Sequence, residues 1–238
     1  MPSSKSPFTV PTVLLDTSLP GWGSGLHPTT YLVLQYLIEL RESTPSSFKR
    51  VVDYGCGSGI LLLACQKLGL GSVSTVGVDI EEDALSATNL NWELNYPPSL
   101  PCRPDPPELL HTRMIVPSFT LSANDLVLAN ILIGALCRPS MVAVLVDALR
   151  EPSSPGNCDG GVIVFSGIRP SQGEVDSLKD AYGNYIEFDD GAYGELSGTD
   201  TLGSVSNYGF DCGDWARVVG RRKVGRGWSR EMSEAAIQ

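Results

Sequence analysis

Residues 51–59, which read V-V-D-Y-G-C-G-S-G, constrain this chain more than any other segment. The β-branched pair at 51–52 suits a buried strand, and the apolar run at 60–70 suits the helix that follows it. Three glycines alternate with small residues between these elements, and glycine readily adopts the positive φ that a tight turn requires. We therefore predict a strand, a glycine turn and a helix whose unpaired N-terminal N–H groups face a ligand.

A carboxylate, Asp79, follows at the end of the next predicted strand, and it can accept hydrogen bonds from both hydroxyl groups of a ribose. The glycine spacing is G-x-G-x-G, which differs from the G-x-G-x-x-G that admits a pyrophosphate. It is more typical of pockets for S-adenosylmethionine, although a turn without any ligand would use the same glycines. The residues expected in this pocket are Asp53, Gly55, Gly57, Gly59 and Asp79.

Strand and helix patterns alternate along the rest of the chain, as in an α/β fold with a parallel sheet covered by helices on both faces. The predicted strands are residues 51–54, 73–79, 112–116, 126–129, 161–166, 184–188 and 214–221. The predicted helices are residues 28–42, 59–69, 81–95, 139–150 and 169–181. Six prolines predict a loop at residues 97–107, and a Gly-, Ser- and Asp-rich composition predicts another at 189–213.

The first predicted helix begins at Pro28, which suits the first turn of a helix. We expect its buried face to carry Tyr31, Leu34, Leu37 and Ile38. After this helix the elements follow one another with short connections, apart from the two predicted loops. The pattern predicts one domain over residues 21–223, a disordered tail at 1–20 and a polar tail at 224–238.

The composition of the 238 residues excludes several classes of protein. Six scattered cysteines and two histidines form no pattern of metal ligands, so we expect reduced cysteines, no metal site and an intracellular protein. Cys56, inside the glycine turn, is interpreted as a small packing residue. The apolar stretch at 126–137 is shorter than the ~20 residues needed to cross a bilayer, so no membrane contact is expected. We predict a cytoplasmic protein, with the mitochondrion or plastid as alternatives.

The net charge of −10 is unevenly distributed. After residue 214 the chain has six basic and two acidic residues, whereas the part before it is strongly acidic. An acidic body disfavours direct nucleic-acid binding and attracts a basic protein substrate. The basic end is interpreted as a charged strand edge and tail, with contact to RNA as the alternative.

Four segments make the chain resemble a class I methyltransferase, and more narrowly the PrmA family, which methylates amino groups of ribosomal protein L11. The resemblance spans residues 20–223 and implies a Rossmann-like fold, with a seven-stranded, mostly parallel sheet whose last strand is antiparallel. The segments are W-G-S-G-L-H-P-T-T at 22–30, the glycine turn with G-V-D-I at 77–80, L-A-N-I-L at 128–132, and F-S-G-I at 165–168 with W-A-R-V-V-G-R at 215–221.

The resemblance implies that Thr30, Gly55, Asp79 and Asn130 contact S-adenosylmethionine. Thr30 can offer a hydroxyl group near the methionine end of the cofactor, although a threonine at a helix start also caps backbone donors. Asn130 lies at the carboxyl edge of the sheet, where its amide can align an acceptor amine, and it is a candidate catalytic residue. His27 is a second candidate, with a structural role in the loop before Thr30 as the alternative.

The implied function is methylation of lysine or N-terminal amines of a basic protein, with ribosomal protein L11 as the expected acceptor. The alternatives are a lysine methyltransferase for another protein, such as an electron-transfer flavoprotein subunit, and a catalytically silent S-adenosylmethionine-binding protein. An NAD-dependent oxidoreductase fits the glycine spacing less well. Two features depart from the family: the N-terminal recognition domain is not expected here, and the segments at 151–159 and 189–213 are longer. Asp105-Pro-Pro-Glu108 resembles a methyltransferase Asp-Pro-Pro-Tyr element but precedes the fourth strand, so we interpret it as loop.

Overall fold

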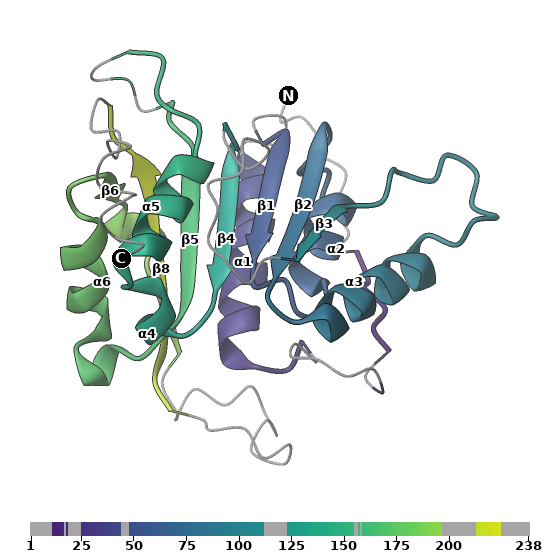
Figure 1. Cartoon of the computed structure of the whole chain (residues 1–238), viewed down its shortest axis with the longest axis horizontal. Coiled ribbons are helices and arrows are strands. Elements are labelled where there is room, and N and C mark those ends of the chain that lie inside the picture. Colours follow the sequence, from purple (N-terminus) through teal and green to yellow (C-terminus); the bar gives the residue numbers. More distant parts are fainter. Residues whose placement is uncertain are drawn as a thin grey trace, which may run out of the picture.

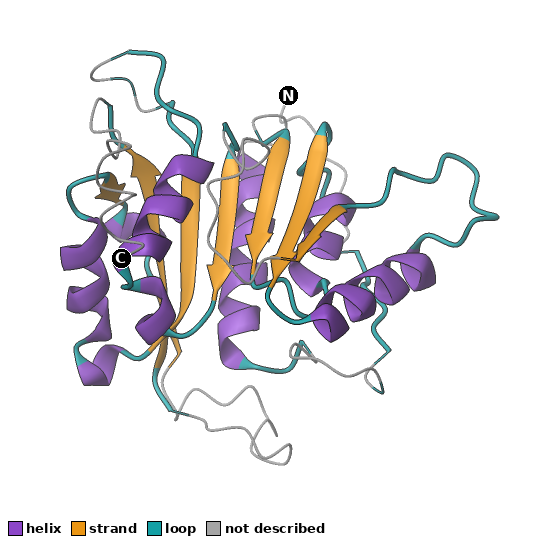
Figure 2. Cartoon of the chain, in the orientation of Figure 1, coloured by secondary structure: helices purple, strands orange, loops and turns teal. Residues whose placement is uncertain are grey.

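The computed structural model of the chain describes residues 11–16, 18, 25–43, 48–111, 123–154, 157, 159–196 and 213–224. Within these ranges eight strands form one sheet, and helices lie on both of its faces (Figures 1 and 2). The strand order is β3-β2-β1-β4-β5-β8-β6, and β7 pairs with β8. The strands are β1 Arg50–Tyr54, β2 Ser74–Asp79, β3 Glu108–His111, β4 Leu126–Asn130, β5 Val162–Ile168, β6 Ile186–Phe188, β7 Gly194–Leu196 and β8 Trp215–Arg222.

The strands β1 to β5 are parallel to one another, and β8 is antiparallel to β5, β6 and β7. The predicted α/β fold, with a mostly parallel sheet and an antiparallel last strand, is therefore confirmed. The described sheet has one strand more than the seven predicted. Part of the expected loop at 189–213 forms β7, in which Glu195 pairs with Ala216 of β8.

The helices divide between the two faces of the sheet. On one face α1 and α2 pack against β1, β4 and β5, and on the other face α4, α5 and α6 do so. α3 packs against α2, β2 and β3. The helices are α1 Pro28–Ser43, α2 Ile60–Lys67, α3 Glu82–Asn95, α4 Ile133–Leu136, α5 Pro139–Ala148 and α6 Glu174–Tyr182. The four-residue helix α4 was not predicted.

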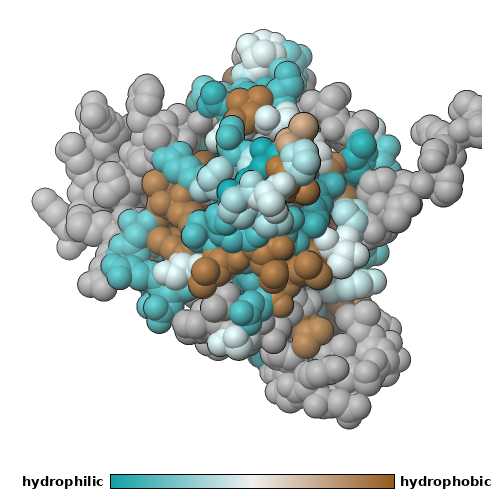
Figure 3. Space-filling view, turned by 90° about the vertical axis from the view of Figure 1, so that its right-hand side faces the viewer, coloured by the Kyte–Doolittle hydropathy of each residue, from teal (hydrophilic) through white to brown (hydrophobic). Residues whose placement is uncertain are grey.

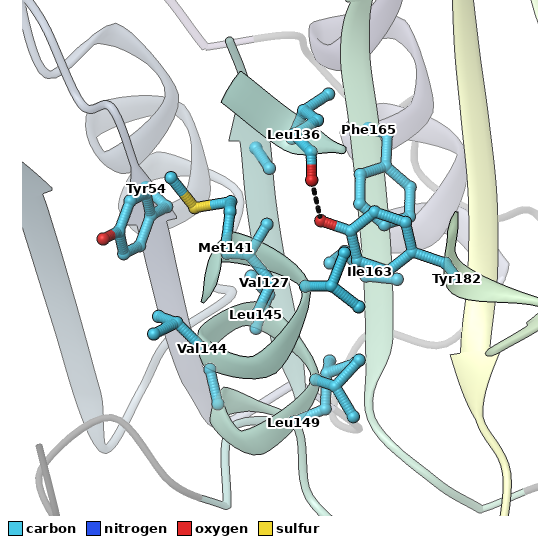
Figure 4. Close-up of a cluster of buried hydrophobic side chains, with 14 of the residues drawn as sticks. Tyr54, Val127, Leu136, Met141, Val144, Leu145, Leu149, Ile163, Phe165 and Tyr182 are labelled. Carbon is cyan, nitrogen blue, oxygen red and sulfur yellow. Dashed lines mark hydrogen bonds between the residues drawn. The ribbon is translucent and has the colours of Figure 1, made fainter. Parts of the chain in front are cut away.

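The core on the α4–α6 side is joined by a polar contact as well as by packing (Figure 4). The hydroxyl of Tyr182 in α6 donates a hydrogen bond to the carbonyl of Leu136 in α4, at 2.8 Å. The ring of Tyr182 also lies 4.6 Å from the ring of Phe165 in β5. A buried tyrosine needs a partner for its hydroxyl, so this contact ties both helices to the central sheet.

The central strands are buried on both faces, which explains why their sequences are continuous apolar runs. In β1 the four residues after Arg50 are all buried, and in β4 the four before Asn130 are. One buried residue of β1 is not apolar: the carboxyl group of Asp53 lies on the α1–α2 side of the strand and is 0% exposed.

The buried face of α1 differs from the predicted one. Of the four residues expected there only Leu37 is fully buried, and Tyr31 is 39% exposed. The core on this side instead contains Val33, Tyr36 and Leu40 together with Leu37, and the predicted Leu34 and Ile38 are partly buried against it. The helix carries apolar residues on more than one side, so its periodicity allows several faces, and only its packing on the sheet selects one.

Two predicted boundaries were wrong, and one predicted strand is not tested. Strand β3 lies at Glu108–His111, whereas the strand expected at 112–116 falls on residues outside the described part. The prolines end at residue 107, so the chain can pair with β2 from Glu108 onward, and this residue is not loop as predicted. The helix expected from Arg169 begins at Glu174, because Gly173 has a left-handed φ of 70° and separates it from a short 3-10 turn.

Part of the tail predicted to be disordered is held against α3. The backbone N–H of Leu14 donates to Asn95, whose side chain donates back to the Leu14 carbonyl. The N–H of Asp16 donates to the side chain of Asn91 at 2.8 Å. Residues 11–16 are therefore described in contact with α3, while residues 1–10, 17, 19 and 20 of the predicted tail lie outside the described part.

The surface on the side of α3 and β3 mixes hydrophilic and hydrophobic residues (Figure 3). Leu90 and Leu94 of α3 are about half exposed, at 50% and 47%. Among the helices of the described residues, none has the length and hydropathy required to span a bilayer.

Candidate active site

The residues predicted to bind a cofactor meet at one edge of the sheet. β1, β2 and β4 are parallel neighbours, and their arrowheads point the same way in Figure 1. Asp79 and Asn130 are the last residues of β2 and β4, and Gly55 follows the last residue of β1. Asn130 was expected just after its strand and instead ends it. The carboxyl edge of an open parallel sheet is where ligands bind in such folds.

The glycine turn has the backbone conformation that its sequence predicts. Gly55, Gly57 and Gly59 have φ values of 84°, 54° and 78°, in the left-handed region. The N–H groups of Gly55 and Cys56 both donate to the carbonyl of Val78, at 2.7 and 3.1 Å. The turn is therefore anchored to the end of β2.

The turn is also held by α3, through two side chains that sequence reasoning missed. The hydroxyl of Thr88 donates to the carbonyl of Gly57 at 2.9 Å, and the amide of Asn91 donates to the carbonyl of Ser58 at 3.0 Å. Both side chains are buried polar groups on a helix. Their place on the same side of the helix as Ala84, Ala87 and Trp92 is the signal in the sequence that could have identified them.

Each carboxylate oxygen of Asp79 accepts a hydrogen bond from the backbone. Its Oδ2 accepts a hydrogen bond from the N–H of Gly57 at 3.0 Å, and its Oδ1 accepts one from the N–H of Glu81 at 3.1 Å. Each carboxylate oxygen has lone pairs beyond the one used here. The carboxylate is therefore oriented by the protein and still able to accept hydrogen bonds from a ligand.

Thr30 and Asn130 meet at the same edge. The Nδ2 of Asn130 lies 3.4 Å from Oγ1 of Thr30 and donates to it. The backbone N–H of Thr30 is bonded to the carbonyl of His27, and the hydroxyl of Ser166 donates to the carbonyl of Thr29 at 3.2 Å. Ser166 is 0% exposed and lies beside Asn130 in the β4–β5 pairing. It belongs to the F-S-G-I segment, for which sequence reasoning assigned no individual role.

His27 lies at this edge and packs against Trp215 of β8. Its Nδ1 is 2.7 Å from Oγ1 of Thr29, and its ring meets the ring of Trp215 edge-on at 4.8 Å. The guanidinium of Arg169 covers the same indole ring, 4.6 Å from its centroid. These contacts support a structural role for His27, and its catalytic role stays a prediction. Residues 22–24, which begin this family segment, lie outside the described part.

Asp53 is a carboxyl group that the described residues leave without a hydrogen bond. Neither of its oxygens has a partner. Burial, with a smaller contribution from Asp79, raises the pKa of Asp53 well above its usual value. Burial and the neighbouring Asp53 also raise the pKa of the Cys56 thiol to about 12, which supports the interpretation of Cys56 as a packing residue.

No group of three or more His, Cys, Asp or Glu side chains arranged to hold a metal ion occurs within the described residues. The side chains at the edge of the sheet are hydroxyl, amide and carboxylate groups, with backbone N–H groups of the turn. Such groups suit the recognition of a nucleoside and an amino acid moiety.

The strand order, the glycine turn and the acidic residue ending β2 are those of the class I methyltransferase fold, whose cofactor is S-adenosylmethionine. The family model described as "Ribosomal protein L11 methyltransferase (PrmA)" matches residues 12–192. The chain therefore belongs to the ribosomal protein L11 methyltransferase family.

Curated relatives agree with this assignment. The ribosomal protein L11 methyltransferases of Salmonella newport and Salmonella typhimurium are both 33% identical over 219 residues, which is 89% of this chain and 56% of each relative. The chain thus spans about half the length of these relatives.

Solved structures agree on the fold. A crystal structure of ribosomal protein L11 methylase from Lactobacillus delbrueckii subsp. bulgaricus has a TM-score of 0.60 and 25% identity, covering 89% of this chain and 85% of that one. A magnesium protoporphyrin IX methyltransferase from Synechocystis, solved with bound S-adenosylmethionine, has a TM-score of 0.53 at 12% identity, covering 86% of each chain. The second similarity concerns the fold alone.

Proposed function

We propose that this chain transfers a methyl group from S-adenosylmethionine to an amino group of a protein, on lysine, on the N-terminus or on both. The observation that carries the proposal is the contact between Asn130 and Thr30, beside the glycine turn and Asp79. The amide and the hydroxyl come from segments one hundred residues apart. Both belong to segments that carry the resemblance to this family, and both lie within the matched residues 12–192.

The residues of the site fit the proposed cofactor. A side chain at Gly55 would collide with Ile131, so the turn can pack against the residue after β4 only as bare backbone. The buried Asp53 carboxyl beneath the turn offers acceptor atoms for which the described residues supply no donor, which suits a ligand carrying an ammonium and a sulfonium group. We propose that Asp79 binds the ribose hydroxyls and that Thr30 and Asn130 bind the methionine end.

When bound, S-adenosylmethionine supplies a methyl group on a positively charged sulfur, and the protein must hold a neutral amine in line with it. Removing the proton from a lysine with an ordinary pKa costs roughly 4–5 kcal/mol at pH 7, and an N-terminal amine costs only ~1 kcal/mol. Partial burial of the amine at the sheet edge reduces the first cost. In this proposal Asn130 accepts a hydrogen bond from the amine and aligns its lone pair.

We propose a basic protein as the acceptor, and ribosomal protein L11 is the first candidate to test, because the relatives are named for that substrate. The net charge of −10 supports a basic partner, since opposite charges raise the rate of encounter. The residues at the start of α3, Glu82 and Asp83, are exposed acids close to Asp79 in the chain.

Transfer of radiolabelled methyl groups from S-adenosylmethionine tests this function. The wild-type chain, incubated with purified ribosomal protein L11 and separately with cell extract, is expected to label protein, and Asp79→Ala is expected to label none. Peptide mass spectrometry then distinguishes lysine from N-terminal methylation. Labelling of other proteins but not of L11 would contradict the acceptor. Absence of any labelled protein, with S-adenosylmethionine bound normally, would indicate a silent binding protein.

A further inference from the structure

Two glycines, Gly55 in the turn after β1 and Gly167 in β5, converge on one residue, Ile131, which directly follows Asn130. A side chain at Gly55 would collide with the Cγ2 methyl of Ile131. A Cβ at Gly167 would lie 2.6 Å from the carbonyl oxygen of Ile131 and 3.0 Å from its carbonyl carbon. Gly55 and Gly167 both have a φ of 84°. Ile131 is thus packed between two backbone segments that only glycine can form.

The second of these segments is an irregularity in β5. The pairing of β5 with β8 shifts register between Phe165 and Ile168, which encloses Ser166 and Gly167. Such bulges redirect a side chain, and they are frequent beside active sites. Here the redirected side chain is Ser166, whose hydroxyl donates to the carbonyl of Thr29 at 3.2 Å.

The order of the strands places Ile131 across the centre of the site. β4 lies between β1 and β5, so the residue after β4 can contact the chain that leaves β1 and the bulge near the end of β5 (Figure 1). Through Gly55 it contacts the glycine turn, and through Asn130 it is joined to Thr30. Ile131 is therefore the packing link between the two halves of the proposed cofactor site.

We propose that Ile131 is a positioning residue, whose Cγ2 methyl sets the conformation of the glycine turn and its distance from Asn130. This inference rests on the proposed function, because the turn and Asn130 are its proposed cofactor contacts. The Cγ2 methyl packs on the face of Gly55 that bears no side chain, so the turn cannot shift toward β4. Without that methyl the turn gains room to move, and the N–H of Gly57 no longer holds Asp79 in one orientation.

The stereochemistry of the side chain separates this role from simple filling of space. Ile131→Val keeps the Cγ2 methyl and loses only the terminal carbon. Ile131→Leu keeps the volume but has no branch at Cβ, so it removes the methyl that contacts Gly55. If Ile131 only fills space, leucine should be tolerated better than valine, because leucine keeps the side-chain volume and valine leaves a small cavity. A positioning residue requires the opposite order.

Calorimetry with S-adenosylmethionine tests this order. We expect Ile131→Leu to weaken cofactor affinity about tenfold, because a small displacement of a binding group is costly. Ile131→Val is expected to retain most of the wild-type affinity. Ile133→Leu is the matched control: it makes the same change two residues further on, at a partly buried residue of the same core, and should leave affinity unchanged.

Amide hydrogen exchange gives a second readout that needs no cofactor. The N–H groups of Gly55, Cys56 and Gly57 are bonded to Val78 and Asp79, and we expect them to exchange faster in Ile131→Leu than in Ile131→Val. Equal affinity and equal exchange in the two variants would overturn the inference. A wild-type chain that does not bind S-adenosylmethionine, yet shows the expected exchange difference, would contradict the proposed function and leave the positioning of the turn by Ile131 supported.

Discussion

The carboxylate of Asp79 accepts a hydrogen bond from the backbone N–H of Gly57, at 3.0 Å. The two residues belong to different βα units, and each was expected from the sequence to face a cofactor. Their contact means that the acid at the end of β2 and the glycine turn after β1 form one preorganised unit. A charged acceptor held by backbone donors loses little freedom when a ligand binds.

Replacing Asp79 is expected to remove cofactor binding with little effect on folding. Hydrogen bonds to a charged group contribute roughly 1.5–3 kcal/mol each, so Asp79→Ala should weaken S-adenosylmethionine binding by at least ~100-fold. Asp79→Asn keeps one acceptor oxygen, so its affinity for S-adenosylmethionine should lie between those of wild type and Asp79→Ala. Calorimetry measures these affinities, and Asp83→Ala, an exposed acid of α3, is the control. An unchanged affinity in Asp79→Ala would contradict the assignment of the pocket.

His27→Ala is expected to leave cofactor affinity within about twofold of wild type and to lower stability. The lost edge-on contact with Trp215 corresponds to roughly 0.5–1.5 kcal/mol, which lowers the melting temperature by about 2–4 °C for each kcal/mol in a chain of this size. His27→Phe keeps a ring at this position and should recover most of the loss. If His27→Phe is fully stable but transfers no methyl, the catalytic interpretation of His27 is favoured.

Asp53 is expected to make the protein less stable as the pH rises. Burial raises its pKa in the folded state, so from about its usual value of 3.8 upward the unfolded chain loses this proton first. The unfolded state then binds fewer protons, and the free energy of unfolding falls by about 1.4 kcal/mol per pH unit until the folded-state pKa is reached. The contribution of Asp53 is thus fully present below about pH 3.8 and is lost progressively as the pH rises to the folded-state pKa.

Asp53→Asn should remove this dependence and make the chain more stable than wild type at pH 7. Urea unfolding at several pH values between 4 and 8 measures the difference, and Asp180→Asn, an exposed acid of α6, serves as the control. Parallel stability curves for wild type and Asp53→Asn would show that the folded chain does not retain the proton.

Arg217→Ala is expected to loosen α1 from β8. The buried guanidinium donates to the carbonyl of Leu32 at 2.8 Å and to that of Ala192 at 3.1 Å, and it covers the ring of Tyr36 at 4.8 Å. Losing these contacts should cost about 2–3 kcal/mol, since hydrogen bonds from charged groups are the stronger ones. Arg221→Ala, in the same strand but less buried, should cost under about 1 kcal/mol. Thermal unfolding that ranks the two variants in the reverse order would contradict this interpretation.

The parts of the fold that were predicted are those whose signals are local. Positive φ at Gly55 follows from the absence of a side chain, and the strand before it follows from two β-branched residues. By contrast, the buried face of α1 was mispredicted, because Tyr31 and Val33 are both apolar and neither their type nor their spacing says which one meets the sheet. Strand β7 was missed because its three residues have no strand pattern of their own and depend on pairing with β8.

The candidate site shows the same division. The sequence by itself determined the glycine turn, the acid at Asp79 and the family, because each depends on residue types at short spacing. Only the tertiary structure decided that Ser166 holds Thr29, that Asp53 is buried without a described partner, and that Ile131 is packed between two glycines. These contacts join residues far apart in the chain, and they arise only when the strands are placed side by side and the helices pack on the sheet.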